Sequence, residues 1–335
     1  MSSIQFFGLL HLADEEYSAV NLKVRNFTEQ IGVYVSNASL LSKSLEAQGL
    51  DFTLLTNNKS KLIELAGDLC KNLRIEQIEC KITVPSGIKF YSAHYKIEVF
   101  RHIGTLDIDY AIFCDLDMIC LAPLPIVFET IVSQGIPLIY DITDQMSPVF
   151  GQEMMIDMFQ ALHSMPSEGR WIGGEFMGGS PDFFEKLTFE IERILPVYFE
   201  KISQSAIATE GNDEVYSTTA IEVMQRNGIY ISDAGLLNIV GRFWSSGTQH
   251  SQKPLRYFEK SFLLHLPANK YFLSNFDSNH QNFDSELFIK EYKRLLKTNK
   301  IRSLPRAILY SLFAIKSRTY GLRSLKLPSS DFKKL

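Results

Sequence analysis

Two aspartates separated by a single residue form a candidate metal-binding pair. Asp115 and Asp117 follow Tyr110 to Cys114, a short apolar run typical of a strand buried on both faces of a parallel sheet. If the extended geometry persists, side chains at positions i and i+2 point to the same side, so the two carboxylates converge. Two buried anions need a cation, and Mg2+ or Mn2+ is commonly held by one or two carboxylates together with the phosphates of a substrate.

An Asp-x-Asp sequence alone is weak evidence, because such pairs are common in solvated turns and helix caps. Here the pair stands between two apolar runs, and the second of them, Met118 to Leu121, is closed by Pro123 and Pro125. This context resembles the Asp-x-Asp motif of GT-A glycosyltransferases, in which a divalent metal bridges the protein and a nucleotide-sugar diphosphate. The resemblance implies that Asp115 and Asp117 bind Mn2+ or Mg2+ and that Asp115 also contacts the nucleotide sugar.

Strand and helix signals alternate in the chain before this pair, which is typical of a parallel sheet with crossover helices. The expected strands are Ile4 to Leu10, Asp51 to Thr56 and Ile75 to Ile82, and the expected helices are Ser36 to Gln48, Lys59 to Asn72 and Tyr91 to Ile103. Their order resembles the nucleotide-binding half of the GT-A fold. We therefore expect an α/β fold with a Rossmann-like, mostly parallel central sheet flanked by helices.

Two segments of this half carry candidate contacts to the donor. In GT-A enzymes the nucleotide base lies over the first loop, which implies roles for Leu10, His11 and Tyr17, although each of them also suits an ordinary loop. Related enzymes carry a basic residue on the helix before the Asp-x-Asp strand, near the donor phosphates or sugar. Lys96 is the candidate, with Arg101 behind it; a solvated lysine whose stem packs on the sheet is the alternative.

A glycine-rich segment follows in the second half, from Arg170 to Pro181. Glycine within a strand often marks a bulge or a backbone that approaches something closely. The segment resembles the Gly-Gly-x-Phe-x-Gly-Gly sequence of family 6 glycosyltransferases and, more loosely, the Asn-containing strand of family 8. The resemblance places Gly173, Gly174 and Glu175 under the donor sugar and acceptor, with Glu175 bonding a sugar hydroxyl. The alternative for Glu175 is an edge-strand charge that faces water.

Two acidic residues, Asp213 and Glu214, open a predicted helix. They resemble the Asp-Glu pair of family 6 and the Asp-Gln pair of family 8, and they follow the glycine-rich strand at the distance seen in those families. The resemblance makes Glu214 the candidate nucleophile or general base and Asp213 a ligand of sugar hydroxyls or the acceptor. Acidic residues in a first turn also interact favourably with the helix dipole and need no catalytic purpose.

His265 leaves an apolar strand and is followed five residues later by Lys270. The pair resembles the closing His-x-x-Gly-x-x-Lys motif of family 8, in which the histidine is the third metal ligand and the lysine binds the diphosphate. A neutral imidazole and an ammonium suit these two roles. The match is imperfect, because the glycine is missing and Pro267 intervenes, and a buried histidine with ordinary partners is the alternative.

The last fifty residues differ from the rest in charge. Residues 286–335 carry thirteen Lys and Arg against three acidic residues, a net charge of +10, whereas the first 285 residues carry a net −14. The basic, aliphatic segment resembles the C-terminal membrane-association segments of bacterial lipopolysaccharide glycosyltransferases. It fits either a helix lying on anionic lipid or a helix that packs on the body. We expect a catalytic domain over 1–272, with a nucleotide-binding half (1–122) and an acceptor half (123–272), and a helical basic segment over 273–335.

Other features limit the cellular setting. The four cysteines show no metal-ligand spacing and are interpreted as reduced thiols. The N-terminal residues lack the features of a signal peptide, and no apolar run is long enough to span a bilayer. We expect a cytoplasmic protein that can bind peripherally to the inner face of the cell membrane through 286–335. Nucleic-acid binding is not expected, because the acidic body has no stripe of basic and aromatic residues.

Together these resemblances imply a metal-dependent glycosyltransferase. It would move a hexose from a UDP-sugar to a hydroxyl of a glycan or glycolipid acceptor, with retention, in the synthesis of bacterial surface polysaccharide or lipopolysaccharide. A sugar nucleotidyltransferase is one competitor, but the sequence from Gly8 to Ala13 lacks the glycine-rich basic loop that it needs after the first strand. A non-catalytic glycan-binding or scaffold protein of the same fold is the other.

Overall fold

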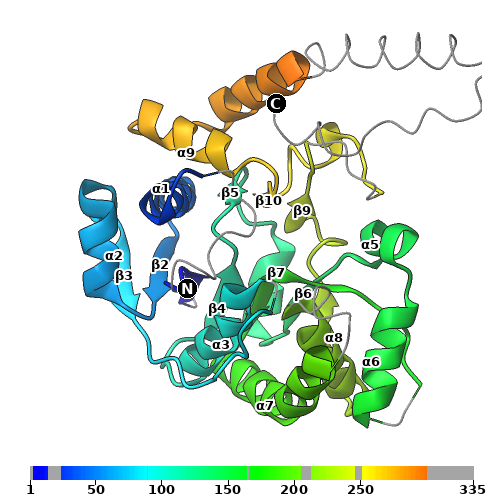
Figure 1. Ribbon diagram of the computed structural model, residues 1–335. Helices are drawn as coiled ribbons and strands as arrows, with labels where there is room; N and C mark the ends of the chain where they lie inside the picture. The colour runs from blue at the N-terminus through cyan, green and yellow to red at the C-terminus, as the bar shows by residue number, and fades with distance from the viewer. Residues whose placement is uncertain are drawn as a thin grey trace, which may run out of the picture. The chain divides into compact units, whose positions relative to one another are not determined.

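The computed structural model describes residues 3–13, 24–88, 90–163, 166–204, 213–245 and 251–299 (Figure 1). The chain forms two compact units, Met1–Ser285 and Glu286–Leu335. The first unit contains a seven-stranded sheet and a three-stranded sheet. The large sheet has the order β3-β2-β1-β4-β7-β6-β8, and its strands are β1 Ile4–Leu9, β2 Asp51–Thr56, β3 Arg74–Gln77, β4 Tyr110–Cys114, β6 Leu138–Asp141, β7 Ile172–Gly179 and β8 Ser232–Asp233.

The large sheet is mixed and mostly parallel. Strands β3, β2, β1 and β4 are parallel to one another, whereas β7 runs antiparallel to both β4 and β6. Helices flank it: α1 Phe27–Glu46, α2 Lys59–Ala66, α3 Lys96–Gly104, α4 Val127–Ser133, α5 Thr143–Phe150, α6 Glu153–His163, α7 Pro181–Gln204, α8 Asp213–Arg226 and α9 Lys270–Asn279, with 3-10 turns η2 Gly67–Cys70, η3 Tyr91–Tyr95 and η4 Leu255–Tyr257. The predicted α/β fold class is therefore confirmed.

The helices form two groups (Figure 1). Helix α7 packs on both α3 and α8, and α8 also contacts β7. Helix α1 contacts α2, α9 and the small sheet. Asp277 of α9 accepts hydrogen bonds from the Lys43 amine (2.7 Å) and the Ser39 hydroxyl (3.1 Å) of α1. These bonds fix α9, whose first residue is Lys270.

Strand β4 lies at the centre of the core, between β1 and β7. All five of its residues are buried, as the sequence predicted for a strand covered on both faces. The Tyr110 hydroxyl donates a hydrogen bond to the carbonyl of Ile136 (2.8 Å), so the one polar side-chain atom of the strand's first residue is satisfied.

The small sheet brings two later strands of the chain beside β5, the strand that follows the Asp-x-Asp pair. Its strands are β5 Met118–Cys120, β9 Val240–Arg242 and β10 Leu263–His265, in the order β5-β10-β9. Strand β10 pairs antiparallel with β5, which places His265 opposite Met118, and parallel with β9, which places His265 opposite Arg242. Strands β9 and β10, which are far from the Asp-x-Asp pair in the sequence, thus lie beside it in the fold.

The first long helix begins earlier than predicted. Helix α1 starts at Phe27 rather than Ser36, because Asn26 caps it by accepting a hydrogen bond from the Glu29 amide (2.9 Å). The added turns bury the polar residue Gln30, so an apolar periodicity does not reveal them. Helix α5 was also not predicted: the sequence pattern from Asp141 to Gly169 indicates irregular structure apart from a short helix around Met154 to His163.

The glycine-rich segment forms β7, an interior strand rather than an edge. Its second glycine pair lies against aromatic rings. A Cβ on Gly178 would stand 3.2 Å from ring atoms of Tyr110, and one on Gly179 would stand 2.3 Å from Phe183. These glycines therefore make room for core side chains.

The second unit is described only over residues 286–299, which are helical. The rest of the basic segment lies outside the described residues, and the division at residue 272 stays a prediction. In the described parts of the chain, no helix is both long and apolar enough to cross a membrane. All four cysteines are free thiols.

A pair of glycine substitutions tests the packing of β7. We expect Gly178→Ala to lower the free energy of unfolding by about 1–3 kcal/mol, because its methyl group would press on the fixed Tyr110 ring. Gly32→Ala, inside α1 with its nearest neighbour 3.9 Å away, should instead stabilise the fold by about 0.5–1 kcal/mol. Urea unfolding of both variants measures this, and an unchanged stability for Gly178→Ala would contradict the packing argument.

Candidate active site and metal centre

The Asp-x-Asp pair lies in the short turn between β4 and β5 rather than on a continuing strand. The Asp115 amide donates to the carbonyl of Glu175 on β7 (2.9 Å), and the Met118 amide donates to the carbonyl of Asp115 (3.3 Å). The Leu266 amide donates to the carbonyl of Asp117 (3.0 Å). The backbone of both aspartates is thus fixed by neighbouring strands.

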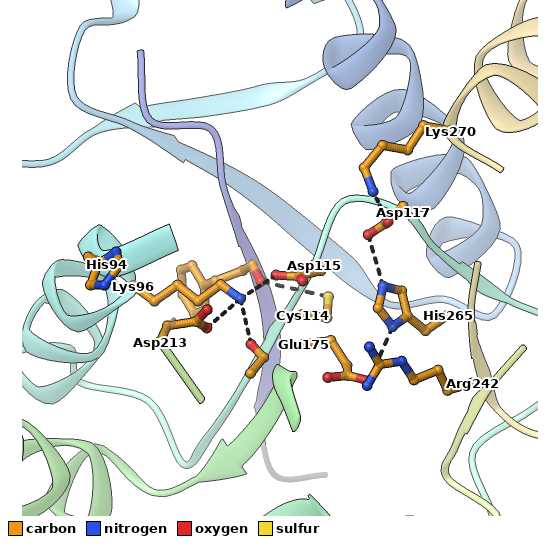
Figure 2. Close-up of polar contacts among 12 residues, drawn as sticks. His94, Lys96, Cys114, Asp115, Asp117, Glu175, Asp213, Arg242, His265 and Lys270 are labelled. Carbon is orange, nitrogen blue, oxygen red and sulfur yellow. Dashed lines mark hydrogen bonds and ion pairs between the residues drawn. The ribbon is translucent and has the colours of Figure 1, made fainter. Parts of the chain in front are cut away.

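Asp115, Asp117 and His265 come together as a group that can hold a metal ion. Each offers one ligand atom, and these atoms lie within 4.8 Å of one another. His265 Nε2 stands 3.2 Å from Asp117 Oδ1 (Figure 2). Two carboxylate oxygens and one imidazole nitrogen suit Mn2+, and the same set with more oxygen ligands from a substrate suits Mg2+. The residues predicted to bind the metal therefore fit that role.

Lys270 is paired with Asp117. Burial by itself would raise the pKa of the Asp117 carboxyl, but Lys270 and His265 hold it well below its usual range. Burial would also lower the pKa of His265, and Asp117 and Glu175 instead raise it to about 9. The sequence predicted Lys270 as a diphosphate ligand, and the structure places its amine beside the metal-binding group.

Lys96 occupies the other side of the aspartate pair. Its amine lies 3.0 Å from Asp115 Oδ1, 2.9 Å from Asp213 Oδ2 and 2.8 Å from the carbonyl of Gly174 (Figure 2). Three acceptors match the three N–H donors of an ammonium group. The lysine is buried, so the alternative of a solvated amine is wrong. Its bonds join a candidate metal ligand to a candidate catalytic residue.

The charges around Asp115 do not fully compensate its burial. Burial raises the pKa of the Asp115 carboxyl, Lys96 opposes that rise, and the neighbouring Asp117 adds to it. Burial likewise opposes the charge on Lys96, but Asp115 and Asp213 raise the pKa of the lysine above its ordinary value. An additional cation on this side of the site would therefore stabilise the ionised form of Asp115.

Asp213 and Glu214 form the first turn of α8, as predicted. Helix α8 is held on β7 by the hydrogen bond from the Ile172 amide to the Thr218 hydroxyl (2.9 Å). Asp213 is buried beside Lys96. Burial raises the pKa of the Glu214 carboxyl to about 7, and the nearby Arg242 limits the rise. A carboxyl with a pKa near neutrality can exchange a proton at physiological pH.

The first glycine pair of β7 gives space to these carboxylates. A Cβ on Gly174 would stand 2.1 Å from Asp213 Oδ2, and one on Gly173 would stand 2.3 Å from Glu175 Oε2. The close approach that the glycines suggested is therefore, in this structure, an approach of protein side chains. Contact with a donor sugar or acceptor stays a prediction for both positions.

Glu175 is 2% exposed and is not an edge-strand charge facing water, so that alternative is wrong. Its Oε1 lies 3.2 Å from His265 Nδ1 and 3.6 Å from Nη1 of Arg242. Burial would raise the pKa of Glu175, but Arg242 and His265 lower it to about 2. Its sequence-based role as a sugar ligand stays a prediction.

The predicted contacts to the nucleotide base divide into three cases. Leu10 is buried in the core, and its amide donates to Leu55. His11 stacks on Tyr95, with ring centroids 3.7 Å apart and planes 7° from parallel, and burial lowers its pKa to about 4. Tyr17 lies outside the described residues. None of these contacts is tested by the structure.

Arg242 and His94 are site residues that sequence reasoning missed. Arg242 leaves a three-residue strand with no motif around it. Buried His94 bonds the Tyr198 hydroxyl through Nε2 (3.0 Å), and its carbonyl accepts from the Tyr216 hydroxyl (3.2 Å). His94 thereby anchors the turn before Lys96 to α7 and α8. Its position two residues before Lys96 was the one available signal.

No protein-family model and no curated protein sequence matches the chain. Two solved structures with similar folds are glycosyltransferases. The galactosyltransferase LgtC, in complex with donor and acceptor sugar analogs, is 11% identical, with a TM-score of 0.47, over 84% of this chain and 98% of its own. The bifunctional glycosyltransferase WbbM is 11% identical, with a TM-score of 0.46, over 79% of this chain and 45% of its own.

Replacing Lys96 tests its role as a charge link. We expect Lys96→Met to lower the free energy of unfolding by about 3–5 kcal/mol, because it leaves buried Asp213 and half-buried Asp115 without their cation. The double variant Lys96→Met/Asp213→Asn should recover part of this loss. Lys71→Met removes an exposed ion pair with Asp68 and should change stability by less than about 1 kcal/mol. Equal, small losses in denaturant unfolding of both lysine variants would contradict the assignment.

The raised pKa of Glu214 predicts a pH dependence of stability. Between pH 4.5 and about 7 the folded chain binds more protons than the unfolded chain, so the free energy of unfolding falls as pH rises. Relative to Glu214→Gln, the natural protein should lose on the order of 3 kcal/mol across this range. Urea unfolding at successive pH values measures the difference. The exposed Glu64→Gln is the control, and a difference between natural protein and Glu214→Gln that is independent of pH would disprove the shift.

Proposed function

We propose that this chain is a metal-dependent glycosyltransferase that transfers a hexose from a UDP-sugar to a hydroxyl of a glycan acceptor. The observation that carries the proposal is the convergence of Asp115, Asp117 and His265 at the end of β4, with a lysine on each side. This end of the parallel strands is the edge at which open α/β sheets bind ligands.

Asp115, Asp117 and His265 would hold the metal, Mn2+ or Mg2+. A divalent ion bound there would offset the negative charge that develops on the departing UDP. Lys270 contributes a fixed positive charge on the same side and is the candidate diphosphate contact. Lys96 contributes by holding Asp115 and Asp213 in place, and it reaches a phosphate only by releasing one of its three present acceptors.

Glu214 is the proposed catalytic carboxylate, and Asp213 the proposed ligand of a sugar hydroxyl or the acceptor. Glycosyl transfer passes through an oxocarbenium-like transition state, which an adjacent carboxylate stabilises or attacks. With a pKa of about 7, Glu214 is largely ionised just above neutral pH and serves as nucleophile or stabiliser in a retaining reaction. In an inverting reaction the same carboxylate would accept the proton of the acceptor hydroxyl.

A cavity of about 560 Å³ at the carboxyl ends of β2 and β3 supports a nucleoside site. Its lining consists of Asn57, Gln77, Ile78, Glu79 and Cys80. Asn57 is held in place by bonds to both the amide (2.8 Å) and the carbonyl (3.1 Å) of Leu12, in the loop after β1. The polar lining and its place on the sheet edge suit the uridine of the donor.

The acceptor and the cellular setting are proposed from charge. A basic segment over 286–335 attached to an acidic body favours an acceptor carried by, or made beside, an anionic membrane. We therefore propose a glycolipid or surface-polysaccharide acceptor in a bacterium, with the enzyme bound peripherally to the inner face of the cell membrane.

Calorimetric titration with UDP tests the proposal. We expect the natural protein to bind UDP with Mn2+ present and to bind it at least about tenfold more weakly without the metal. Asp117→Asn should abolish the gain from Mn2+, whereas the exposed Asp68→Asn should keep it. Equal UDP binding with and without metal, or no binding, would overturn the metal role and favour a non-catalytic scaffold. Release of UDP from a panel of UDP-hexoses, lost in Glu214→Gln, would then identify the donor.

A further inference from the structure

The buried carboxylate of Glu175 faces a candidate metal ligand. Its Oε1 lies 3.2 Å from Nδ1 of His265, and the opposite ring nitrogen, Nε2, lies 3.2 Å from Asp117 Oδ1 (Figure 2). The histidine ring therefore bridges two carboxylates, one on each of its nitrogens. Only the Asp117 side contains the other candidate metal ligands.

The two nitrogens of an imidazole have separate tasks when it binds a metal. One carries a proton and donates it in a hydrogen bond, and that bond decides that the other presents its lone pair. A carboxylate is a common acceptor for this proton, and it fixes the orientation of the ring and increases its basicity. Glu175 is placed to accept from Nδ1–H of His265, which leaves Nε2 for the metal.

Glu175 also holds a second ligand through its backbone. Its carbonyl accepts the amide of Asp115 (2.9 Å). One residue of the interior strand β7 thus contacts Asp115 at the end of β4 and His265 at the end of β10. The strand pairs with both β4 and β6, so Glu175 stands on a rigid part of the fold.

Arg242 supports Glu175 from the third strand of the small sheet. It pairs with His265 in the register of β9 and β10, and its Nη1 lies 3.6 Å from Glu175 Oε1. Arg242 is 7% exposed, and its guanidinium lies over the Trp244 ring, 5.2 Å from the ring centroid. A planar guanidinium packed in this way has little freedom, so it supplies a fixed positive charge behind the carboxylate.

The absence of a side chain at Gly173 leaves room for the carboxylate of Glu175. A Cβ at this position would stand 2.3 Å from Glu175 Oε2 and 2.8 Å from its carboxyl carbon. Any larger residue at position 173 would displace the carboxylate from its place beside His265. The first glycine of the glycine-rich segment therefore makes room for Glu175.

From this geometry we infer that Glu175, supported by Arg242, is a positioning residue that orients His265 for binding the divalent metal. The inference rests on the proposed function, because it needs a metal at Asp115, Asp117 and His265. It assigns Glu175 a place behind the metal ligands, in contrast to the sugar-hydroxyl role that the sequence resemblance implied.

The affinity for Mn2+ tests the inference directly. Mn2+ is titrated into protein with a saturating, fixed concentration of UDP, and the free ion is followed by its electron paramagnetic resonance signal. We expect Glu175→Gln to weaken Mn2+ binding by about 10- to 100-fold. Glu222→Gln is the matched control, because Glu222 is also a buried carboxylate of this half of the chain but bonds Ser167 and Arg226. It should stay within about twofold of the natural protein.

A spectroscopic reading separates positioning from general stability. With Co2+ in place of Mn2+, the visible absorption of the ion reports its ligand field. Glu175→Gln should change the band positions or intensities at saturating Co2+, whereas Glu222→Gln should leave them as in the natural protein. An identical Co2+ spectrum and an Mn2+ affinity within about twofold in Glu175→Gln would overturn the inference.

The outcomes distinguish this inference from the proposed function. If the natural protein itself shows no Mn2+-dependent UDP binding, the proposed function fails. If the natural protein binds Mn2+, Asp117→Asn does not, and Glu175→Gln binds it normally, the metal site stands and only the role of Glu175 is wrong. A normal Mn2+ affinity with a raised KM for donor or acceptor in that variant would restore the sugar-ligand role.

A second variant covers the case in which Glu175→Gln fails to fold, as circular dichroism would reveal. Glu175→Asp keeps the charge but withdraws the carboxylate by one methylene from His265 Nδ1. A loss of Mn2+ affinity of about tenfold in this folded variant supports the inference, and an affinity within about twofold of the natural protein overturns it.

Discussion

The electrostatic cost of gathering carboxylates inside the fold is the constraint on which the rest of the site depends. Asp115 and Asp117 come from the turn between β4 and β5, Glu175 from β7 and Asp213 from α8, and all four meet at one end of the sheet. An unpaired buried ion costs several kcal/mol, so each carboxylate requires a cation within reach. The pairing is shared: Lys96 joins Asp115 to Asp213, Lys270 and His265 serve Asp117, and Arg242 and His265 serve Glu175. Lys96 and His265 each serve two acids, so removing either of them affects both of its partners.

Backbone space is the second requirement, and β7 provides it. This strand lies between β4 and β6, and its glycines leave room for Asp213 and Glu175 at one end and for Tyr110 and Phe183 at the other. The same residues that look like a flexible, substrate-facing segment in the sequence thus allow dense packing. A strand without side chains at these positions lets two layers of charged and aromatic groups approach the sheet closely. The glycines of β7 are therefore required both for the site and for the packing of the core.

The accuracy of the sequence-based elements follows from where their apolar residues lie. Strands β2 and β4 were predicted at their observed bounds, because both are nearly continuous runs of buried residues. Helix α1 was predicted too short, because its first turns bury Gln30, a residue that polarity alone places in a loop. Short strands are expected from the sequence over Ile229 to Ile231 and Leu236 to Val240, and the observed β8 and β9 lie a few residues later, since two or three residues carry no periodicity.

The sequence alone determined the chemical identity of the candidate ligands: an Asp-x-Asp pair after a buried strand, an acidic pair opening a helix, and a histidine leaving an apolar strand. Residue type and short spacing are local properties, so they can be read without a fold. Only the tertiary structure decided which of these groups touch. His265 meets Asp117 across 148 positions and Glu175 across 90, and Arg242 joins them through the order of a three-stranded sheet. Such contacts depend on sheet order and register, which arise from the packing of the whole chain and not from the residues beside each ligand.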